Sequence, residues 1–338
     1  MRRSVRKVEF AFVRSRLFLL VAALFVNVAG LMAVAVAEDS EEYQETCIDE
    51  KGNILNPTCT PSEFANAYSK LGTESASKRD YDKAIEAFNE AIKRSPDAMA
   101  YYNRANTYTN VHDYEHAIQD YGAAIGLDHN FANAFNNRCF VYNVLGQYKL
   151  AIRDCSRAIK LDHTQANFFI GRATAYYKKN DYVPALSDYN QSIHLNANNG
   201  NAFIGRARVY MRKRDYDQAL KDLDKAIGLV PRDANALNNR CWVHALKGQL
   251  SLALLDCTKA VNIRPTDPHL LDSLAFTYLK MSESANDKNG YLDKAIKNYE
   301  MALVISPNQA NSLYGRGVAK LKKGEVKEGR KKNQADDR

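Results

Sequence analysis

The sequence predicts an all-α protein made of stacked, repeated helix pairs. An Ala followed by Ile or Leu recurs seven times between Ala84 and Ala295, in steps of 33, 34, 34, 34, 34 and 42 residues. Each interval contains two stretches of helical period. Prolines follow the second stretch in several units, where they end a helix: Pro96, Pro231, Pro265 and Pro307. A fixed period of this length is typical of an array whose units bury their apolar faces against one another.

The N-terminal region has the features of an export signal. Six basic residues in the first 16 positions precede an apolar run from Leu17 to Ala37, which ends in Ala-Val-Ala before Glu38. This layout predicts a signal peptide at residues 1–37 that is cleaved between Ala37 and Glu38. The run is also long enough to span a bilayer, so retention as a membrane anchor is the alternative. In both cases the basic flank stays inside and the repeats are exported.

The rest of the chain divides at the repeats. Residues 38–63 form an acidic segment that contains Cys47 and Cys59. A helix at 310–323 has no second helix after it and is expected to cap the array, and residues 324–338 form a basic polar tail. Seven units fill residues 64–309: 65–97, 98–131, 132–165, 166–199, 200–233, 234–267 and 268–309.

The repeated positions resemble those of the tetratricopeptide repeat family, whose pattern is an aromatic residue, Leu-Gly and Tyr, then Ala, Phe, Ala and Pro. The first unit departs from it at Ser75, where Tyr is usual. The resemblance extends over about residues 64–322. It implies a right-handed superhelix that binds protein or peptide partners along its inner face. The first unit matches the pattern at Tyr68, Leu71, Gly72, Ala84, Phe88, Ala91 and Pro96.

Two positions of each unit vary together in size. The eighth and twenty-fourth residues are expected to face each other where the two helices pack, and in five units a small residue stands opposite a large one, as in Ala207 and Leu223. In the other two units both residues are cysteines. Because cysteines behind an export signal pair in an oxidising compartment, we expect disulfides, with free buried thiols as the alternative. The expected disulfides are Cys139–Cys155, Cys241–Cys257 and Cys47–Cys59.

A second pair of positions carries opposite charges. Units two to six have Arg at the seventh position and Asp at the twenty-third, whereas units one and seven lack both. This joint variation predicts an ion pair within each central unit, since a guanidinium matches a carboxylate. Two independent solvent-facing charges are the alternative. The predicted pairs are Arg104–Asp120, Arg138–Asp154, Arg172–Asp188, Arg206–Asp222 and Arg240–Asp256.

The resemblance also implies which first-helix positions line the partner-binding groove. Aromatic residues, Met and Arg mixed with amides are typical of a peptide-binding surface. Phe140, Trp242 and Phe276 have an alternative role, which is to fill gaps between adjacent units. Asn also recurs at the second position of a unit, where we expect it to cap the helix rather than to contact a peptide. The implied groove residues are Tyr102, Asn106, Asn136, Phe140, Asn143, Ile170, Tyr177, Ile204, Arg208, Met211, Asn238, Trp242, Phe276 and Tyr314.

The sequence therefore favours a non-enzymatic scaffold or adaptor, exported to the periplasm or another oxidising compartment. It shows no catalytic set, phosphate loop or metal-ligand spacing, so no cofactor or metal is expected. Residues 38–319, which comprise the acidic segment and the repeats, have a net charge near −1, which does not favour nucleic-acid binding. Membrane contact is expected only through an uncleaved N-terminal segment. The alternative function is structural self-association or envelope assembly through the helix at 310–323 and the basic tail, which would make the protein a homo-oligomer.

Overall fold

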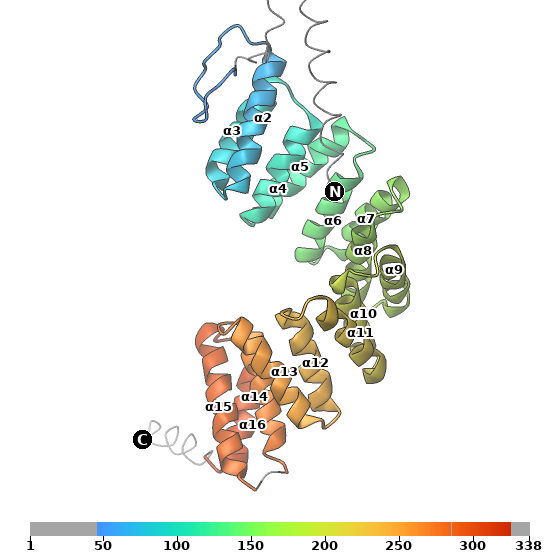
Figure 1. Ribbon diagram of the computed structural model, residues 1–338, viewed down its shortest axis with the longest axis vertical. Helices are drawn as coiled ribbons and strands as arrows, with labels where there is room; N and C mark the ends of the chain where they lie inside the picture. Colours follow the sequence, from blue (N-terminus) through green and yellow to red (C-terminus); the bar gives the residue numbers. More distant parts are fainter. Residues whose placement is uncertain (1–45, 285, 326–338) are drawn as a thin grey trace, which may run out of the picture. The chain divides into compact units, whose positions relative to one another are not determined.

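The computed structural model describes residues 46–284 and 286–325 (Figure 1). The chain separates into two compact regions, Met1–Cys59 and Thr60–Arg338. The predicted signal segment and its cleavage site, and most of the basic tail, lie outside the described residues. Within the described ranges, no helix combines the length and the apolar character needed to cross a membrane.

The described part of the N-terminal region, residues 46–59, is a short loop closed by a disulfide. Cys47 and Cys59 are bonded, with their Cα atoms 5.9 Å apart. The Asp49 carboxylate accepts hydrogen bonds from the side chain and the backbone N–H of Asn53, and these bonds lower the pKa of Asp49. Gly52 has a φ of 89°, which suits the tight turn between them.

The described residues of the second region, Thr60–Arg338, form fifteen α-helices. They are α2 (Pro61–Ser77), α3 (Tyr81–Arg94), α4 (Ala98–Asn110), α5 (Tyr114–Leu127), α6 (Ala132–Val144), α7 (Tyr148–Leu161), α8 (Ala166–Lys178), α9 (Tyr182–Leu195), α10 (Gly200–Arg212), α11 (Tyr216–Leu229), α12 (Ala234–Leu246), α13 (Leu250–Ile263), α14 (Pro268–Met281), α15 (Lys288–Ile305) and α16 (Ala310–Lys323).

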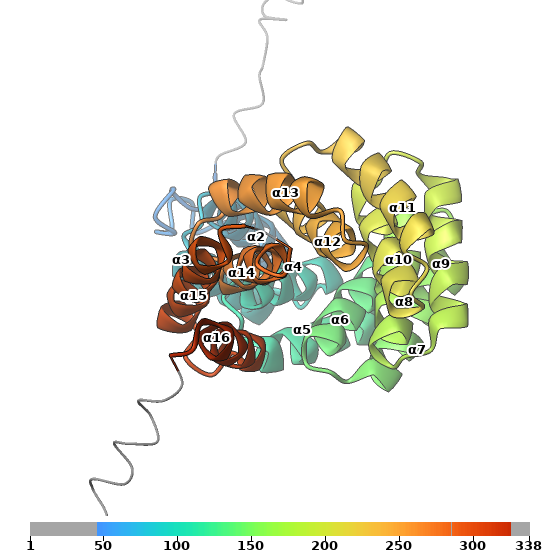
Figure 2. The ribbon, with the colours of Figure 1, turned by 90° about the horizontal axis from the view of Figure 1, so that it is seen from below.

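The helices alternate between two layers. Each even-numbered helix from α2 to α14 packs against the odd-numbered helix that follows it, and these two form one unit. Even-numbered helices of consecutive units also contact each other, whereas within the described residues no two odd-numbered helices do. The even-numbered helices therefore form the inner layer of a superhelix (Figure 2). Seven helix pairs followed by α16 confirm the predicted all-α, right-handed superhelical solenoid.

Side-chain caps define many of the helix starts. Thr60 and Glu63 form a capping box at α2, so this helix begins at Pro61, four residues before the expected start of the first unit. The prediction that the recurring asparagines cap the inner helices is wrong. The caps are the residues just before each helix, such as Asp97 and Asp233, and Asn235 lies inside the first turn. The register places the second position two residues after the cap, where a side chain cannot serve as the N-cap.

The twenty-fourth residue of a unit lies between two inner helices. It packs against the small eighth residue of its own unit, as Tyr189 does against Ala173. It also faces the sixth residue of the next unit, which is Gly205 beside the Tyr189 ring. A Cβ at Gly205 would overlap that ring. Close packing of the fifth unit against the fourth therefore depends on a residue without a side chain at this position.

Replacing Gly205 with Ala is expected to destabilise the protein by about 1–3 kcal/mol, because the added methyl group forces the Tyr189 ring or the backbone to move. Gly228 is the matched control, since it is exposed in α11 and a Cβ there would have no atom within 4 Å. Gly228→Ala is expected to stabilise the helix by about 0.5–1 kcal/mol. Urea unfolding measures both changes, and equal effects of the two substitutions would contradict this account of the packing.

Candidate partner-binding groove

All fourteen residues implied for the groove lie on the inner helices between α4 and α16. Phe140 on α6 is 55% exposed and Tyr314 on α16 is 77% exposed, while the other twelve are half-buried. Each inner helix from α4 to α16 therefore carries at least one partly accessible side chain of this set, and two large aromatic residues are open to solvent.

Trp242 and Phe276 contact each other across two units. Their rings stack with centroids 4.5 Å apart, and Trp242 lies on α12 while Phe276 lies on α14. This contact agrees with the alternative role of filling the gap between adjacent units. Phe140 differs from them, because more than half of its surface remains exposed. Of the three aromatic residues, Phe140 is the one best placed to contact a partner.

Polar contacts already engage Tyr102 and Asn106. The Asn137 side chain donates hydrogen bonds to the Tyr102 hydroxyl, at 3.0 Å, and to Asn106 Oδ1, at 2.9 Å. The Tyr121 hydroxyl also donates to Asn106 Oδ1, at 2.6 Å. Asn137 was not among the expected residues because it occupies the sixth position, which the family groove does not use. These bonds join the second and third units and reduce what Tyr102 and Asn106 can offer a partner.

Arg208 places a cation on the inner layer. Its guanidinium lies 4.9 Å from the centre of the Tyr177 ring, which comes from the preceding unit. Among the described residues it makes no ion pair. Stacking on an aromatic face orients a guanidinium while its edge remains available to a carboxylate. Arg208 is therefore a candidate for recognising an acidic group.

The five Arg–Asp pairs lie where the two helices of each central unit meet. In every pair the Arg Nε and Nη2 atoms donate to the two carboxylate oxygens, at 2.6–3.2 Å. The five aspartates are buried. The hydrogen bond to Asp188 raises the pKa of Arg172, and Asp222 does the same for Arg206. These pairs are structural, and their buried carboxylates are not available to a partner.

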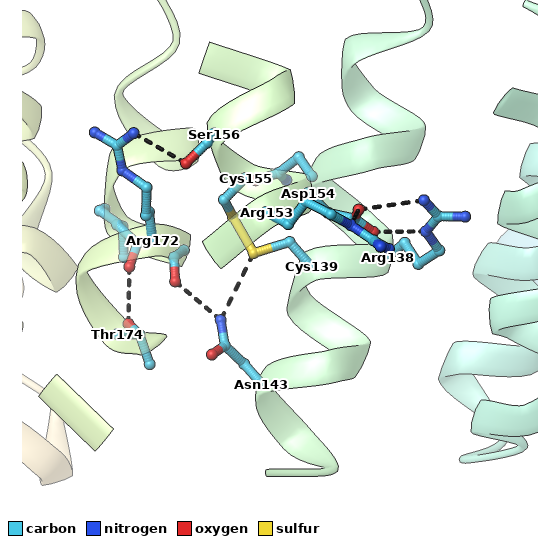
Figure 3. The surroundings of a disulfide bond; sticks show 12 residues. Arg138, Cys139, Asn143, Arg153, Asp154, Cys155, Ser156, Arg172 and Thr174 are labelled. Carbon is cyan, nitrogen blue, oxygen red and sulfur yellow. Dashed lines mark hydrogen bonds and ion pairs between the residues drawn. A yellow bond between two sulfur atoms is a disulfide. The ribbon is translucent and has the colours of Figure 1, made fainter. Parts of the chain in front are cut away.

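In four of the five pairs, a third contact of the guanidinium links consecutive units. Nη1 of Arg206 donates to Asn190 Oδ1 at 2.7 Å, and Nη1 of Arg240 donates to Asp224 at 2.8 Å. The acceptor is the twenty-fifth residue of the preceding unit. Arg104 makes the same contact to Asn89, and Arg172 makes it to Ser156 (Figure 3). The sequence signal was a polar residue at this position in most central units, which our comparison of charged positions passed over.

Arg138 lacks this contact because the twenty-fifth residue of its preceding unit is Gly122. A Cβ at Gly122 would lie 3.6 Å from Arg138 Nη1, which is ordinary van der Waals contact. Gly122→Asn is therefore expected to stabilise the protein by about 1–2 kcal/mol, through helix propensity and one charge-assisted hydrogen bond. Gly122→Ala supplies helix propensity alone, and about 0.6 kcal/mol more of it than Asn does. Unfolding experiments in which Gly122→Ala is more stable than Gly122→Asn by about 0.6 kcal/mol or more would contradict the proposed hydrogen bond.

The structure joins the cysteines in the pairs that the register indicates. Cys139 and Cys155 are bonded with Cα atoms 5.5 Å apart, and Cys241 and Cys257 with Cα atoms 5.3 Å apart. All four are fully buried. Figure 3 shows the Cys139–Cys155 bond between the two helices of the third unit, beside Asn143 of the inner helix. Each bond takes the place of the small and large side chains found in the other units.

A buried carboxylate holds α16 against α14. Asp272 is 8% exposed, and Ser312 Oγ donates a hydrogen bond to it at 2.6 Å. Burial raises the pKa of Asp272, which the Ser312 bond partly opposes. The folded state therefore binds a proton at this site more readily than the unfolded chain, whose carboxyl pKa is near 3.8.

Stability is accordingly expected to fall as pH rises above 4 through the folded-state pKa of Asp272. Asp272→Asn keeps an acceptor for Ser312 and removes the charge. The free energy of unfolding of this variant, relative to that of the native protein, should therefore be higher at pH 7.5 than at pH 3.5. Chemical denaturation at both pH values measures the difference. The same difference in unfolding free energy at both pH values would show that the buried charge does not destabilise the protein.

Comparison with known proteins identifies the repeats. Models of the tetratricopeptide repeat match residues 65–97, 98–131, 132–165 and 204–268, and a model described as TPR repeat matches residues 288–324. Stress-induced-phosphoprotein 1 of Caenorhabditis elegans is 35% identical over 83 residues, which are 24% of each chain. Small glutamine-rich tetratricopeptide repeat-containing protein 2 of Saccharomyces cerevisiae is 34% identical over 61 residues, or 18% of each chain. The chain thus matches a quarter or less of either curated relative.

Solved structures share the fold. A tetratricopeptide repeat protein from Parabacteroides merdae superposes with a TM-score of 0.62 at 16% identity, covering 76% of this chain and 99% of that one. A chain of the APC/C hetero-tetramer Cut9-Hcn1 also gives 0.62, at 15% identity, covering 77% of this chain and 53% of its own. At this level of identity the likeness concerns the fold alone. Together with the repeat matches, it shows that the chain belongs to the tetratricopeptide repeat family.

Proposed function

We propose that this chain is a non-enzymatic, exported scaffold that binds extended segments of other proteins on the inner face of helices α6, α8 and α10. Tetratricopeptide repeats are protein-interaction scaffolds, and the observation that carries the proposal is the exposure of Phe140. An aromatic side chain that stays more than half exposed on the inner layer of a solenoid gives a partner an apolar anchor point.

The proposed segment combines an apolar residue with an acidic one. Phe140 on α6 would contact the apolar side chain, and Arg208 on α10 would bind the carboxylate. Ile170 and Ile204 lie between them in the chain, on α8 and α10, and are half-buried, so they would contribute apolar surface. An Arg oriented by an aromatic ring favours a carboxylate over a neutral group.

Export is supported by the disulfides together with the N-terminal sequence. All six cysteines are paired, and two of the three bonds join helices in the core of the solenoid. Such structural disulfides are typical of secreted and periplasmic proteins and rare in a reducing cytosol. An exported, processed protein should begin at Glu38, which N-terminal mass spectrometry of the protein from its native cell tests. An N-terminus at Met1 would favour the membrane anchor.

The groove is tested by selecting peptides from a random displayed library on the folded protein. We expect the selected peptides to share an apolar and an acidic residue. A synthetic copy of one selected peptide should bind at least tenfold more weakly to Phe140→Ala and to Arg208→Ala. Val183→Ala is the control, because Val183 is also apolar and is 79% exposed but lies on the outer helix α9. Equal binding to all three variants would show that the groove assignment is wrong.

A further inference from the structure

Helix α16 repeats the features of an inner helix that has a partner. Its fourth residue is the apolar Leu313, its seventh is Arg316 and its eighth is the small Gly317. In α10 the same positions hold Phe203, Arg206 and Ala207, which pack against or bond to α11. Within the described residues, no helix follows α16. The chain therefore contains one more docking face for an outer helix than it has outer helices in its described part.

This face is open. The eighth residue is fully buried in units two to seven, whereas Gly317 is exposed and a Cβ there would have no atom within 4 Å. Leu313 is 43% exposed and Leu321 is 64% exposed on the same helix. Gly317 and Leu321 are four residues apart and Leu313 precedes Gly317 by four, so the three form one stripe. The stripe is apolar and has a narrow place at its centre where another helix can approach closely.

Arg316 adds a charge requirement. The seventh residue of each of the five central units is an Arg that bonds to the buried Asp of its outer helix. Arg316 has no hydrogen bond or ion pair with any of the residues that the structure describes. A helix that docks on α16 as an outer helix docks on its unit would place a carboxylate beside Arg316 and a large apolar residue against Gly317.

We propose that α16 is a docking site for an amphipathic helix of another protein, with an Ala, three residues later an Asp or Glu, and directly after that a large apolar residue. The second, fourth and fifth units show this arrangement, for example as Ala219, Asp222 and Leu223. The site lies at the end of the solenoid and is separate from the proposed groove. It would let the scaffold hold a helical partner while the groove holds an extended one.

Charge argues against a second copy of this chain as the occupant. Helix α16 contains Arg316 and three lysines and no acidic residue. Two α16 helices packed face to face would bring like charges together, which destabilises an interface.

The chain's own tail is also a poor match. If the repeat register is continued, Lys332 takes the position of the Asp and Asn333 takes that of the large apolar residue. The tail would thus place a cation opposite Arg316.

Helix α16 is itself well anchored, so the face is available without refolding. Besides the buried Ser312–Asp272 bond, Lys320 lies 3.0 Å from Glu300 and Lys322 lies 2.7 Å from Glu283. These contacts connect α16 to the seventh unit and leave Leu313, Gly317 and Leu321 exposed. A preformed surface of this kind binds a helix at a lower entropic cost than one that must order first.

The probe for the test is a synthetic peptide of residues 216–229, because this outer helix carries the proposed pattern. Titrated into the full chain, it should bind with one-to-one stoichiometry. Gly317→Leu, which fills the narrow place, and Arg316→Glu, which reverses the charge, should each weaken binding at least tenfold. Asn311→Ala on the exposed first turn of α16 is the control and should have no effect.

A charge exchange makes the test specific. A peptide with Asp222→Lys should bind the native chain poorly. Its affinity should rise at least tenfold when the full chain carries Arg316→Glu. Phe140→Ala should leave peptide binding unchanged, so failure of this site and failure of the groove are distinguishable.

Three results would overturn the proposal. The first is no binding at peptide concentrations up to about 1 mM, where affinity would be too weak for recognition. The second is a dimer in light scattering that Arg316→Glu dissociates, which would make a second copy the occupant. The third is peptide binding that strengthens tenfold or more when the chain is ended at Glu325, which would make the tail the occupant.

Discussion

Replacing Arg206 with Ala is expected to lower the free energy of unfolding by about 3–5 kcal/mol, because the substitution leaves a buried carboxylate without its partner. Asp222 is 5% exposed, and both of its oxygens accept hydrogen bonds from Arg206, at 2.6 and 2.8 Å. The variant also loses the bond to Asn190 of the preceding unit. Urea denaturation measures the loss, and hydrogen exchange should locate it in α10 and α11.

The chain supplies the control for this prediction. Its first unit has Leu71 and Ala87 at the two positions of the ion pair, and both are buried. The double variant Arg206→Leu, Asp222→Ala places the residues of the first unit at these two positions. Replacing a buried ion pair with apolar residues often changes stability little. We expect it to be within about 1–2 kcal/mol of the native protein. A double variant as unstable as Arg206→Ala would mean that the bond between units, and not the unpaired charge, determines the cost.

Contacts within a unit could be predicted from the sequence because seven units repeat them. When Ala105 faces Tyr121 in one unit and Cys139 faces Cys155 in the next, the joint change identifies two positions that touch. Ion pairs follow from the same comparison. The period itself then specifies the solenoid, since every unit buries the same face.

Contacts between units were harder to predict. They depend on the rotation from one unit to the next, which the register of a single unit does not define. The stacking of Trp242 on Phe276, the bonds of Asn137 and the guanidinium contact at the twenty-fifth position all arise there. The same limit applies to the groove, whose shape is set by that rotation. The asparagine caps failed for a different reason, because the position of a cap requires the helix start to be known within one residue.

Removal of the Cys139–Cys155 bond is expected to cost about 3 kcal/mol, because the bond closes an interval of 16 residues and restricts the unfolded chain. The variant Cys139→Ala, Cys155→Ala measures this cost together with the small cavity that it creates. In the next unit the corresponding positions are Ala173 and Tyr189. In both units a Gly lies beside the twenty-fourth residue: Gly171 beside Cys155 and Gly205 beside Tyr189.

A second variant, Cys139→Ala with Cys155→Tyr, copies this arrangement of the fourth unit and should lose less stability than the double Ala variant, since the ring fills the space between α6, α7 and α8. Reductant breaks all three disulfides, so it should lower the stability of the native protein at least to that of the double Ala variant. Alkylation in denaturant without reductant should label no thiol, because all six cysteines are bonded. Two results would contradict a stabilising role for this bond. One is a double Ala variant as stable as the native protein, and the other is six labelled thiols before reduction.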